Sequence, residues 1–178
     1  MAQRQSGYAR EHNDAYETPE WVTLAVLPYL RQHCACPWDC ANGPRSKIVR
    51  ALREAGFGLR AFATGDDFLA RASLPYAHVD AICTNPPYGG GGRLAVQFIE
   101  HALELVPVVA MLLRVDFDSG KTRQHLFGDC RAFDRKIVLL DRVAWFERQG
   151  RPSDNHAWFI WNAKHRGRPT ISYARCST

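Results

Sequence analysis

Asn85, Pro86, Pro87 and Tyr88 form a stiff polar and aromatic stretch directly after the largely apolar run VDAICT, residues 79–84. Each proline lacks an N–H donor and has a fixed φ, and it also restricts the preceding residue to extended geometry. The carbonyl groups of the stretch and the Asn85 side chain are therefore held as acceptors near one point. Two acceptors suit an –NH2 group, and Tyr88 offers a flat face beside them. The stretch predicts a site for a planar heterocycle that carries an exocyclic amine.

Four glycines, Gly89–Gly92, follow Tyr88. Because glycine adopts conformations that other residues avoid, this segment has little conformational restraint of its own. Two interpretations stay open. The glycines let the loop close over a bound group, or they form an ordinary flexible connection.

The elements that must position these residues alternate between helix and strand. Helical patterns are expected at 18–30, 45–57, 93–106 and 121–128, and strand patterns at 58–64, 79–84, 108–115, 135–141, 156–162 and 170–174. Such alternation is typical of an α/β sheet, mostly parallel, with helices on both faces. Ligands of these sheets bind outside the carboxyl ends of the strands. Asn85 occupies such a place, after the strand expected at 79–84, and Arg114 and Phe117 lie at the carboxyl end of the next strand, where they are expected to line the pocket for the heterocycle.

The stretch Asn85–Tyr88 resembles motif IV of the S-adenosylmethionine-dependent amino-methyltransferases, above all the adenine-N6 DNA methyltransferases, including small phage and prophage enzymes. YETPEW, residues 16–21, looks like their motif X, and GDDFL, residues 65–69, looks like their acidic-aromatic motif. The resemblance extends over about residues 14–173. It implies a Rossmann-like class I methyltransferase fold with a mixed, mostly parallel seven-stranded sheet. We expect one domain over residues 1–178, with a flexible arm at 1–15.

The resemblance also implies roles for particular residues. It assigns catalysis to Asn85, Pro86, Pro87 and Tyr88, with no metal ion. It assigns binding of S-adenosylmethionine to Tyr16, Thr18, Pro19, Asp39, Gly43, Asp66, Asp67, Phe68 and Asn85. In the implied reaction Asn85 Oδ1 and the Pro86 carbonyl accept hydrogen bonds from the amine of a base that has left the DNA stack, and Tyr88 stacks on that base.

The cofactor loop departs from the family pattern, Asp/Glu-Pro-x-x-Gly-x-Gly. In WDCANGPRSKIV, Asp39 occupies the acidic position and Gly43 the first glycine, but Cys40 replaces the proline and Arg45 the second glycine. The expected strand at 58–64 also ends without an acidic residue for the ribose. Two readings follow: a divergent active enzyme, or a decayed relative that keeps the fold and binds nucleic acid without methyl transfer.

Charge and composition indicate the partner and the compartment. The net charge is +5, and residues 114–178 hold thirteen Lys and Arg against seven Asp and Glu, whereas residues 1–113 hold ten against eleven. This asymmetry fits a polyanionic partner and equally an ordinary solvated basic surface. The resemblance implies DNA as the partner, with an RNA base or a protein glutamine as alternative substrates. About ninety residues follow Tyr88, which leaves little room for a separate target-recognition domain and favours low sequence specificity, a helper subunit or another partner. No signal peptide or membrane-spanning run is apparent, so a cytoplasmic protein with reduced cysteines is expected.

Three other patterns carry weaker signals. His33, Cys34, Cys36 and Cys40 form a weak zinc pattern, because Cys34 and Cys36 are separated by one residue. Asp39, Asp66 and Asp67 form a weak magnesium pattern. The third pattern is a mixture of aromatic and basic residues towards the C-terminus. The aromatic residues are either part of a groove for nucleic acid or residues of the core. The aromatic residues are Trp145, Trp158, Phe159 and Trp161, and the basic residues are Arg142, Arg148, Arg151, Lys164, Arg166 and Arg168.

Overall fold

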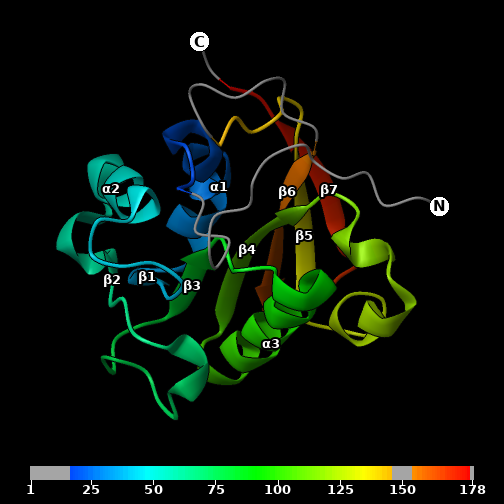
Figure 1. Ribbon diagram of the computed structural model, residues 1–178, viewed down its shortest axis with the longest axis horizontal. Helices are drawn as coiled ribbons and strands as arrows, with labels where there is room; N and C mark the ends of the chain where they lie inside the picture. The colour runs from blue at the N-terminus through cyan, green and yellow to red at the C-terminus, as the bar shows by residue number, and fades with distance from the viewer. Residues whose placement is uncertain (1–16, 146–153, 177–178) are drawn as a thin grey trace.

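The computed structural model describes residues 17–145 and 154–176. Its centre is a seven-stranded sheet in the order β2-β1-β3-β4-β6-β5-β7 (Figure 1). The strands are β1 Pro37–Asp39, β2 Phe62–Ala63, β3 Ala81–Thr84, β4 Val108–Arg114, β5 Phe133–Leu139, β6 His156–Asn162 and β7 Thr170–Ala174. All neighbouring strands are parallel except the two pairs that involve β6. The predicted mixed, mostly parallel sheet is confirmed.

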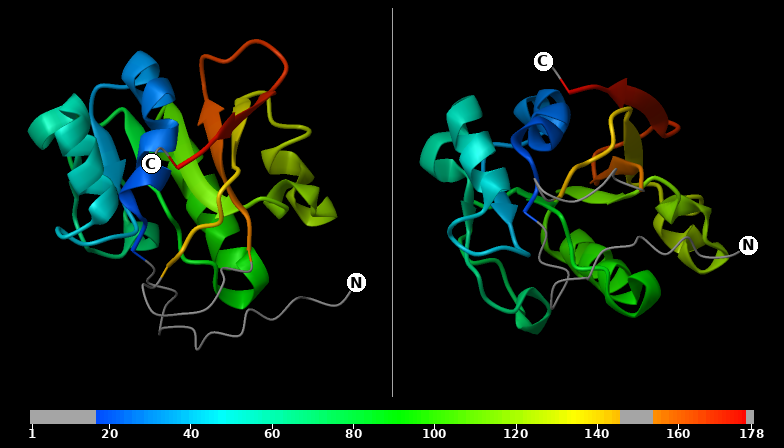
Figure 2. Two further views of the ribbon diagram at one scale, coloured as in Figure 1. Left: turned by 90° about the horizontal axis from the view of Figure 1, so that it is seen from above. Right: turned by 45° about the horizontal axis from the view of Figure 1, so that its top comes forward.

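Helices cover both faces of this sheet (Figures 1 and 2). On one face lie α1 Glu20–His33 and α2 Lys47–Leu52, and on the other lies α3 Gly89–Leu105. α2 continues into the π-type turn η2 Arg53–Phe57, and the short 3-10 turns are η3 Gly58–Arg60, η4 Phe68–Ala70, η5 Phe117–Ser119 and η6 Lys121–Leu126. Pro19 stands at the N-cap of α1, one residue before the position that the sequence suggests.

The strand β6 connects the two halves of the core. All seven of its residues are buried, and successive side chains of a strand point to opposite faces. Trp158 therefore packs in the core that α1 covers, whereas Phe159 and Trp161 pack in the core on the α3 side. The nucleic-acid interpretation of these three aromatic residues is wrong, because all three are completely buried. Full burial of one large apolar side chain stabilises a fold by about 1.5–3 kcal/mol.

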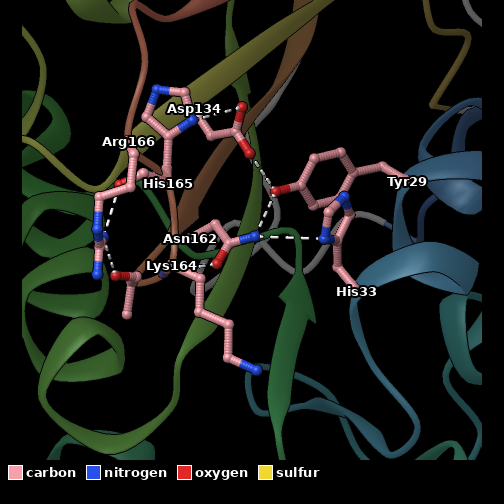
Figure 3. Close-up of polar contacts among 8 residues, drawn as sticks. Tyr29, His33, Asp134, Asn162, Lys164, His165 and Arg166 are labelled. Carbon is pink, nitrogen blue, oxygen red and sulfur yellow. Dashed lines mark hydrogen bonds and ion pairs between the residues drawn. The ribbon is translucent and has the colours of Figure 1, made fainter.

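A polar network ties α1 to the antiparallel strands (Figure 3). The Tyr29 hydroxyl donates to Asp134 of β5, and Asn162 Nδ2 donates to the Tyr29 oxygen over 3.0 Å. His165 Nδ1 lies 3.3 Å from the other Asp134 oxygen. On the same face Trp158 Nε1 donates to the Val22 carbonyl over 2.7 Å. Burial raises the pKa of Tyr29, so its phenol stays a donor.

The basic loop between β6 and β7 lies away from the edge where β3 ends. Since β6 is antiparallel, its last residue, Asn162, pairs with Val108, the first residue of β4. The exposed Lys164, Arg166 and Arg168 follow Asn162, so they lie at the amino edge of the parallel strands. A strand of seven residues such as β4 spans roughly 20 Å. These three cations therefore do not line the same surface as Asn85, and Arg148 and Arg151 lie outside the described residues.

Within the described residues no helix is long and apolar enough to span a membrane.

Candidate functional site

Asn85 leaves the sheet at the carboxyl end of β3. β1, β3 and β4 are parallel neighbours, so the residues that follow them meet at one edge. Asn85 is half-buried, Pro86 is buried, and Pro87 and Tyr88 are half-buried. The two prolines prevent further pairing in the sheet. The stretch therefore ends β3 and presents its polar groups at the edge where ligands of α/β sheets bind.

Tyr88 packs against the segment that follows β4. Its ring meets the Phe117 ring edge-on, with centroids 6.5 Å apart. Phe117 itself is only 3% exposed, so it supports Tyr88 from the core and leaves little surface for a base. Burial also raises the pKa of Tyr88, which keeps its phenol neutral. The arrangement holds the Tyr88 ring in one orientation, as a stacking platform requires.

The four glycines form a defined turn. Gly90, Gly91 and Gly92 have φ values of +52°, +74° and +92°, which residues with a Cβ rarely adopt. Arg123 of η6 holds this turn: its Nη2 donates to the Gly91 carbonyl over 3.3 Å and its Nη1 donates to the Phe117 carbonyl over 3.0 Å. The guanidinium also lies 3.9 Å from the centre of the Phe117 ring. Arg123 thus links the glycine turn to the ring that supports Tyr88.

Gly92→Ala is expected to damage this arrangement. A Cβ at Gly92 would lie 2.9 Å from Arg123 Nη2 and 3.3 Å from Phe117 Cε2, in addition to the strain of its positive φ. We expect a loss of about 2–3 kcal/mol in the free energy of unfolding, measured by urea denaturation.

Gly91→Ala is the matched control, because its φ is also positive but a Cβ there would meet nothing within 4 Å. Gly91→Ala should show only the destabilisation caused by an alanine at positive φ, and it should be more stable than Gly92→Ala. Equal stability of the two variants would contradict the contact between the glycine turn and Arg123.

Asp39 joins the loop after β1 to the end of β3. Its side chain is completely buried and accepts from Ser46 Oγ over 2.5 Å, from Thr84 Oγ1 over 2.6 Å and from Asn42 Nδ2 over 2.9 Å. Burial raises the pKa of Asp39, and these hydrogen bonds oppose the rise. The Asp39 carboxylate is therefore engaged within the protein and fixes the loop relative to Thr84, the neighbour of Asn85.

A cleft of about 240 Å³ lies between this loop and the start of α1. It is lined by Glu17, Thr18, Asn42, Gly43, Pro44, Arg45, Ser46, Lys47 and Ile48. The fold thus brings together Thr18 and Gly43, two residues that the sequence assigns to the cofactor. Pro19 is half-buried beside Thr18, and Tyr16 lies outside the described residues.

Asp66, Asp67 and Phe68 do not line this cleft. Asp66 accepts from Arg71 Nε over 2.6 Å, and Asp67 caps η4 by accepting from the Leu69 amide over 3.1 Å. Phe68 is 2% exposed and packs in the core, where its ring lies edge-on to Trp38. Their role in cofactor binding stays a prediction for the two exposed acids, whereas the burial of Phe68 leaves almost no ring surface for an adenine.

Gly65 lies where the loop after β2 contacts the loop after β1. It has φ +77°, and a Cβ there would lie 3.2 Å from Gly43 Cα. The loop after β2 therefore packs directly on the loop that lines the cleft.

Arg114 and His156 meet at the same edge, from β4 and β6. They are register partners, and Arg114 Nη2 lies 3.2 Å from Asp116 Oδ2. Arg114 is half-buried, so it remains a candidate for lining a base pocket. His156 is 5% exposed, and its ring lies edge-on to the half-buried Trp145. Burial lowers the pKa of His156 to about 4.

The His156 pKa predicts a pH dependence of stability. Between pH 6.5 and about 4 the unfolded chain binds a proton at this ring and the folded chain does not, so the free energy of unfolding falls as the pH decreases. The expected loss is on the order of 3 kcal/mol, measured by urea denaturation across this range. His156→Asn should flatten the profile by that amount. His78→Asn, at an exposed histidine, should leave the profile unchanged, and identical profiles for all three proteins would contradict the prediction.

The described residues contain no group of three or more His, Cys, Asp or Glu arranged to hold a metal ion. Cys34 Sγ instead donates to the Leu30 carbonyl over 3.2 Å, and Cys36 Sγ donates to the Arg60 carbonyl over 3.0 Å. Asp39 is held by its own donors in the core, whereas Asp66 and Asp67 are exposed. The zinc and magnesium patterns in the sequence thus correspond to no site among these residues.

Sequence reasoning missed three residues that organise the site: Ser46, Thr84 and Arg123. Ser46 carried a usable signal, because serine directly before a helical pattern is a preferred N-cap, and its Oγ accepts from the Val49 amide. Thr84 and Arg123 carried none, since their partners lie 45 and 32 residues away in the chain.

No protein-family model matches the sequence, and no curated protein matches it. Solved structures do. A Listeria monocytogenes protein assigned as a class I S-adenosylmethionine-dependent methyltransferase superposes with a TM-score of 0.59 and 13% identity, over 90% of this chain and 66% of that one. A Pyrococcus horikoshii protein assigned as an RNA methyltransferase superposes with a TM-score of 0.59 and 12% identity, over 89% of this chain and 92% of that one. A modification subunit assigned to a type I restriction enzyme of Vibrio vulnificus superposes with a TM-score of 0.50 and 13% identity, over 92% of this chain and 47% of that one.

These likenesses concern the fold, because the identities are 12–13%. This chain spans slightly under two thirds of the Listeria protein and about half of the Vibrio subunit. The expected fold is confirmed: the chain has the Rossmann-like fold of the class I methyltransferases.

Proposed function

We propose that this chain transfers the methyl group of S-adenosylmethionine to the exocyclic N6 amine of adenine in DNA. One observation carries the proposal: Asn85-Pro86-Pro87-Tyr88 follows β3 at the carboxyl edge of a methyltransferase fold, next to the loop that lines the cleft. Asp39 and Thr84 connect the two through a hydrogen bond of 2.6 Å. The amine site and the cofactor site are thus neighbours held in a fixed relation, which is what transfer between two bound groups requires.

The cleft supports the choice of cofactor. Thr18 lines it and is 3% exposed, and its buried Oγ1 forms no hydrogen bond with another described residue. A buried polar atom without a partner is costly, so a polar ligand group at this place is favoured. Thr18 and Gly43 would hold the cofactor, which supplies an electrophilic methyl group on a sulfonium.

The chain's own residues then act on the amine. Asn85 Oδ1 and the Pro86 carbonyl accept hydrogen bonds from its two N–H groups, which raises the electron density on the nitrogen and orients its lone pair. Tyr88, supported by Phe117, stacks on the base. Positioning of this kind accounts for much of the rate of group transfer between two bound reactants.

DNA is the proposed partner because Asn85-Pro86-Pro87-Tyr88 resembles the motif of the adenine-N6 DNA methyltransferases. The net charge of +5 suits any nucleic acid, since cations neutralise backbone phosphates, but Lys164, Arg166 and Arg168 lie at the opposite edge of the sheet and do not contribute to this surface. The target adenine must leave the duplex to reach Asn85.

The test is a transfer assay with radiolabelled S-adenosylmethionine. Purified protein is incubated in parallel with duplex DNA, single-stranded DNA, RNA and a glutamine-containing peptide, and the products are digested and identified by mass spectrometry. N6-methyladenine from DNA is the expected product. Label in RNA or in glutamine would redirect the proposal to those substrates. Cofactor binding without transfer to any of them would support the decayed relative, and DNA affinity would then be measured.

A further inference from the structure

Arg45 is the cation that the cofactor cleft leaves available. It lines the cleft and is exposed, and no hydrogen bond or ion pair joins its side chain to another described residue. The neighbouring Lys47 differs, because its Nζ lies 2.9 Å from Glu17 Oε2. The Asn42 amide nitrogen and the Ser46 hydroxyl are both engaged by Asp39.

Thr18 offers a second polar group to a ligand in this cleft. Its buried Oγ1 has no partner among the described residues and belongs to the lining of the same cleft. A hydroxyl donor and a planar guanidinium that line one cleft suit a carboxylate, which accepts two parallel hydrogen bonds from arginine and a third from a hydroxyl. Glu17 also lines the cleft; its Oε2 pairs with Lys47, and its other carboxylate oxygen suits an ammonium group. The polar groups of the cleft therefore match an α-amino acid.

We propose that Arg45 and Thr18 form the carboxylate subsite for the methionine part of S-adenosylmethionine. The inference rests on the proposed function and deepens it. Glycines at this loop of a nucleotide-binding fold let backbone N–H groups approach the ligand. Pro44 removes one such N–H, and the Arg45 guanidinium supplies charged donors in its place. Arg45 is thus a specificity-determining residue of an altered loop. Its presence is not evidence that the loop has lost the ability to bind the cofactor.

The experiment compares two ligands by calorimetric titration: S-adenosylmethionine and its decarboxylated form, which lacks only the carboxylate. Wild-type protein should bind S-adenosylmethionine about 10- to 100-fold more tightly. Arg45→Ala and Arg45→Gly should lose that factor for S-adenosylmethionine and leave the affinity for the decarboxylated ligand unchanged. Arg45→Lys should retain part of the discrimination, because it keeps the charge but not the paired donors.

Arg50→Ala is the matched control, since Arg50 is an exposed cation of α2 outside the cleft. Thermal melts show whether each variant is folded, and the exposure of Arg45 predicts unchanged melting temperatures.

The outcomes separate the two proposals. Tighter binding of S-adenosylmethionine by Arg45→Gly, or unchanged binding by Arg45→Ala, overturns the subsite and leaves the proposed function standing. Weaker DNA binding by Arg45→Ala with unchanged cofactor affinity assigns the guanidinium to a backbone phosphate, and also overturns the subsite. Absence of binding of both ligands to folded wild-type protein overturns the proposed function, and the subsite with it.

Discussion

Replacing Asn85 by alanine is expected to lower kcat for methyl transfer by about 10²- to 10³-fold, a loss typical of removing one hydrogen-bonding group aimed at a reacting centre. The side chain supplies one of two acceptors for the amine, and alanine leaves only the Pro86 carbonyl. KM for DNA should change little, because Tyr88, the proposed stacking residue, is untouched. Single-turnover kinetics with radiolabelled cofactor measure the effect.

Asn85→Asp is the matched variant. Aspartate occurs at this position in the motif that the stretch resembles, and it keeps an acceptor of the same shape, so most of the activity should remain. Calorimetric titration with S-adenosylmethionine should show that both variants still bind the cofactor. If Asn85→Ala retains the wild-type kcat, the amine is held by other groups and the catalytic role of the stretch is wrong.

Replacing Asp39 by alanine is expected to lower the free energy of unfolding by about 3 kcal/mol or more. Three donors converge on this buried carboxylate, from Asn42, Ser46 and Thr84. Each buried donor left without a partner costs about 1–3 kcal/mol, although a hydroxyl can rotate to a new acceptor. Urea denaturation at neutral pH measures the loss, and activity should fall as well because Thr84 adjoins Asn85.

Asp67→Ala provides the comparison for Asp39→Ala. Asp67 is exposed and caps only the short turn η4, so its removal should cost about 1 kcal/mol. Asp39→Asn should fall between the two, since it keeps one acceptor oxygen. If Asp39→Ala is as stable as Asp67→Ala, the hydrogen bonds of Asp39 contribute no stability, and other contacts must hold the cofactor loop against β3.

The buried strands of the fold could be predicted from the sequence because they are fully enclosed. β4 and β6 read as continuous apolar runs, and their predicted limits agree with the structure to within one residue. β1 has only three residues, Pro37–Asp39, and no periodic pattern reveals so short a strand; only the family resemblance indicated it. The strand expected at 58–64 is reduced to Phe62–Ala63 because residues 58–60 form a 3-10 turn. Residues 121–126 form a 3-10 turn where an α-helix was expected.

The candidate site could be predicted in its position but not in its contacts. The order of the chain places Asn85 at the end of a parallel strand, and this follows from the alternation of helices and strands alone. The partners of Asp39 and the contact of Arg123 with the glycine turn depend on how distant segments pack, which no local pattern encodes. Phe68 and Phe117 were expected at ligand surfaces, but the apolar gain of burying a phenylalanine favours the core.

The position of α1 depends on the last quarter of the chain. Thr18 belongs to the segment that leads into α1, and α1 is held on the sheet by Trp158, which donates to Val22, and by the bond between Tyr29 and Asp134. During synthesis the residues of α1 therefore emerge long before their partners, and contacts of such large sequence separation form late. A chain that stops before residue 156 contains Asn85 and the entire cofactor loop, yet it lacks the strand β6 that completes the sheet. If the chain binds S-adenosylmethionine as proposed, binding would report that synthesis has passed β6, and it would serve as a measure of folding in truncated chains.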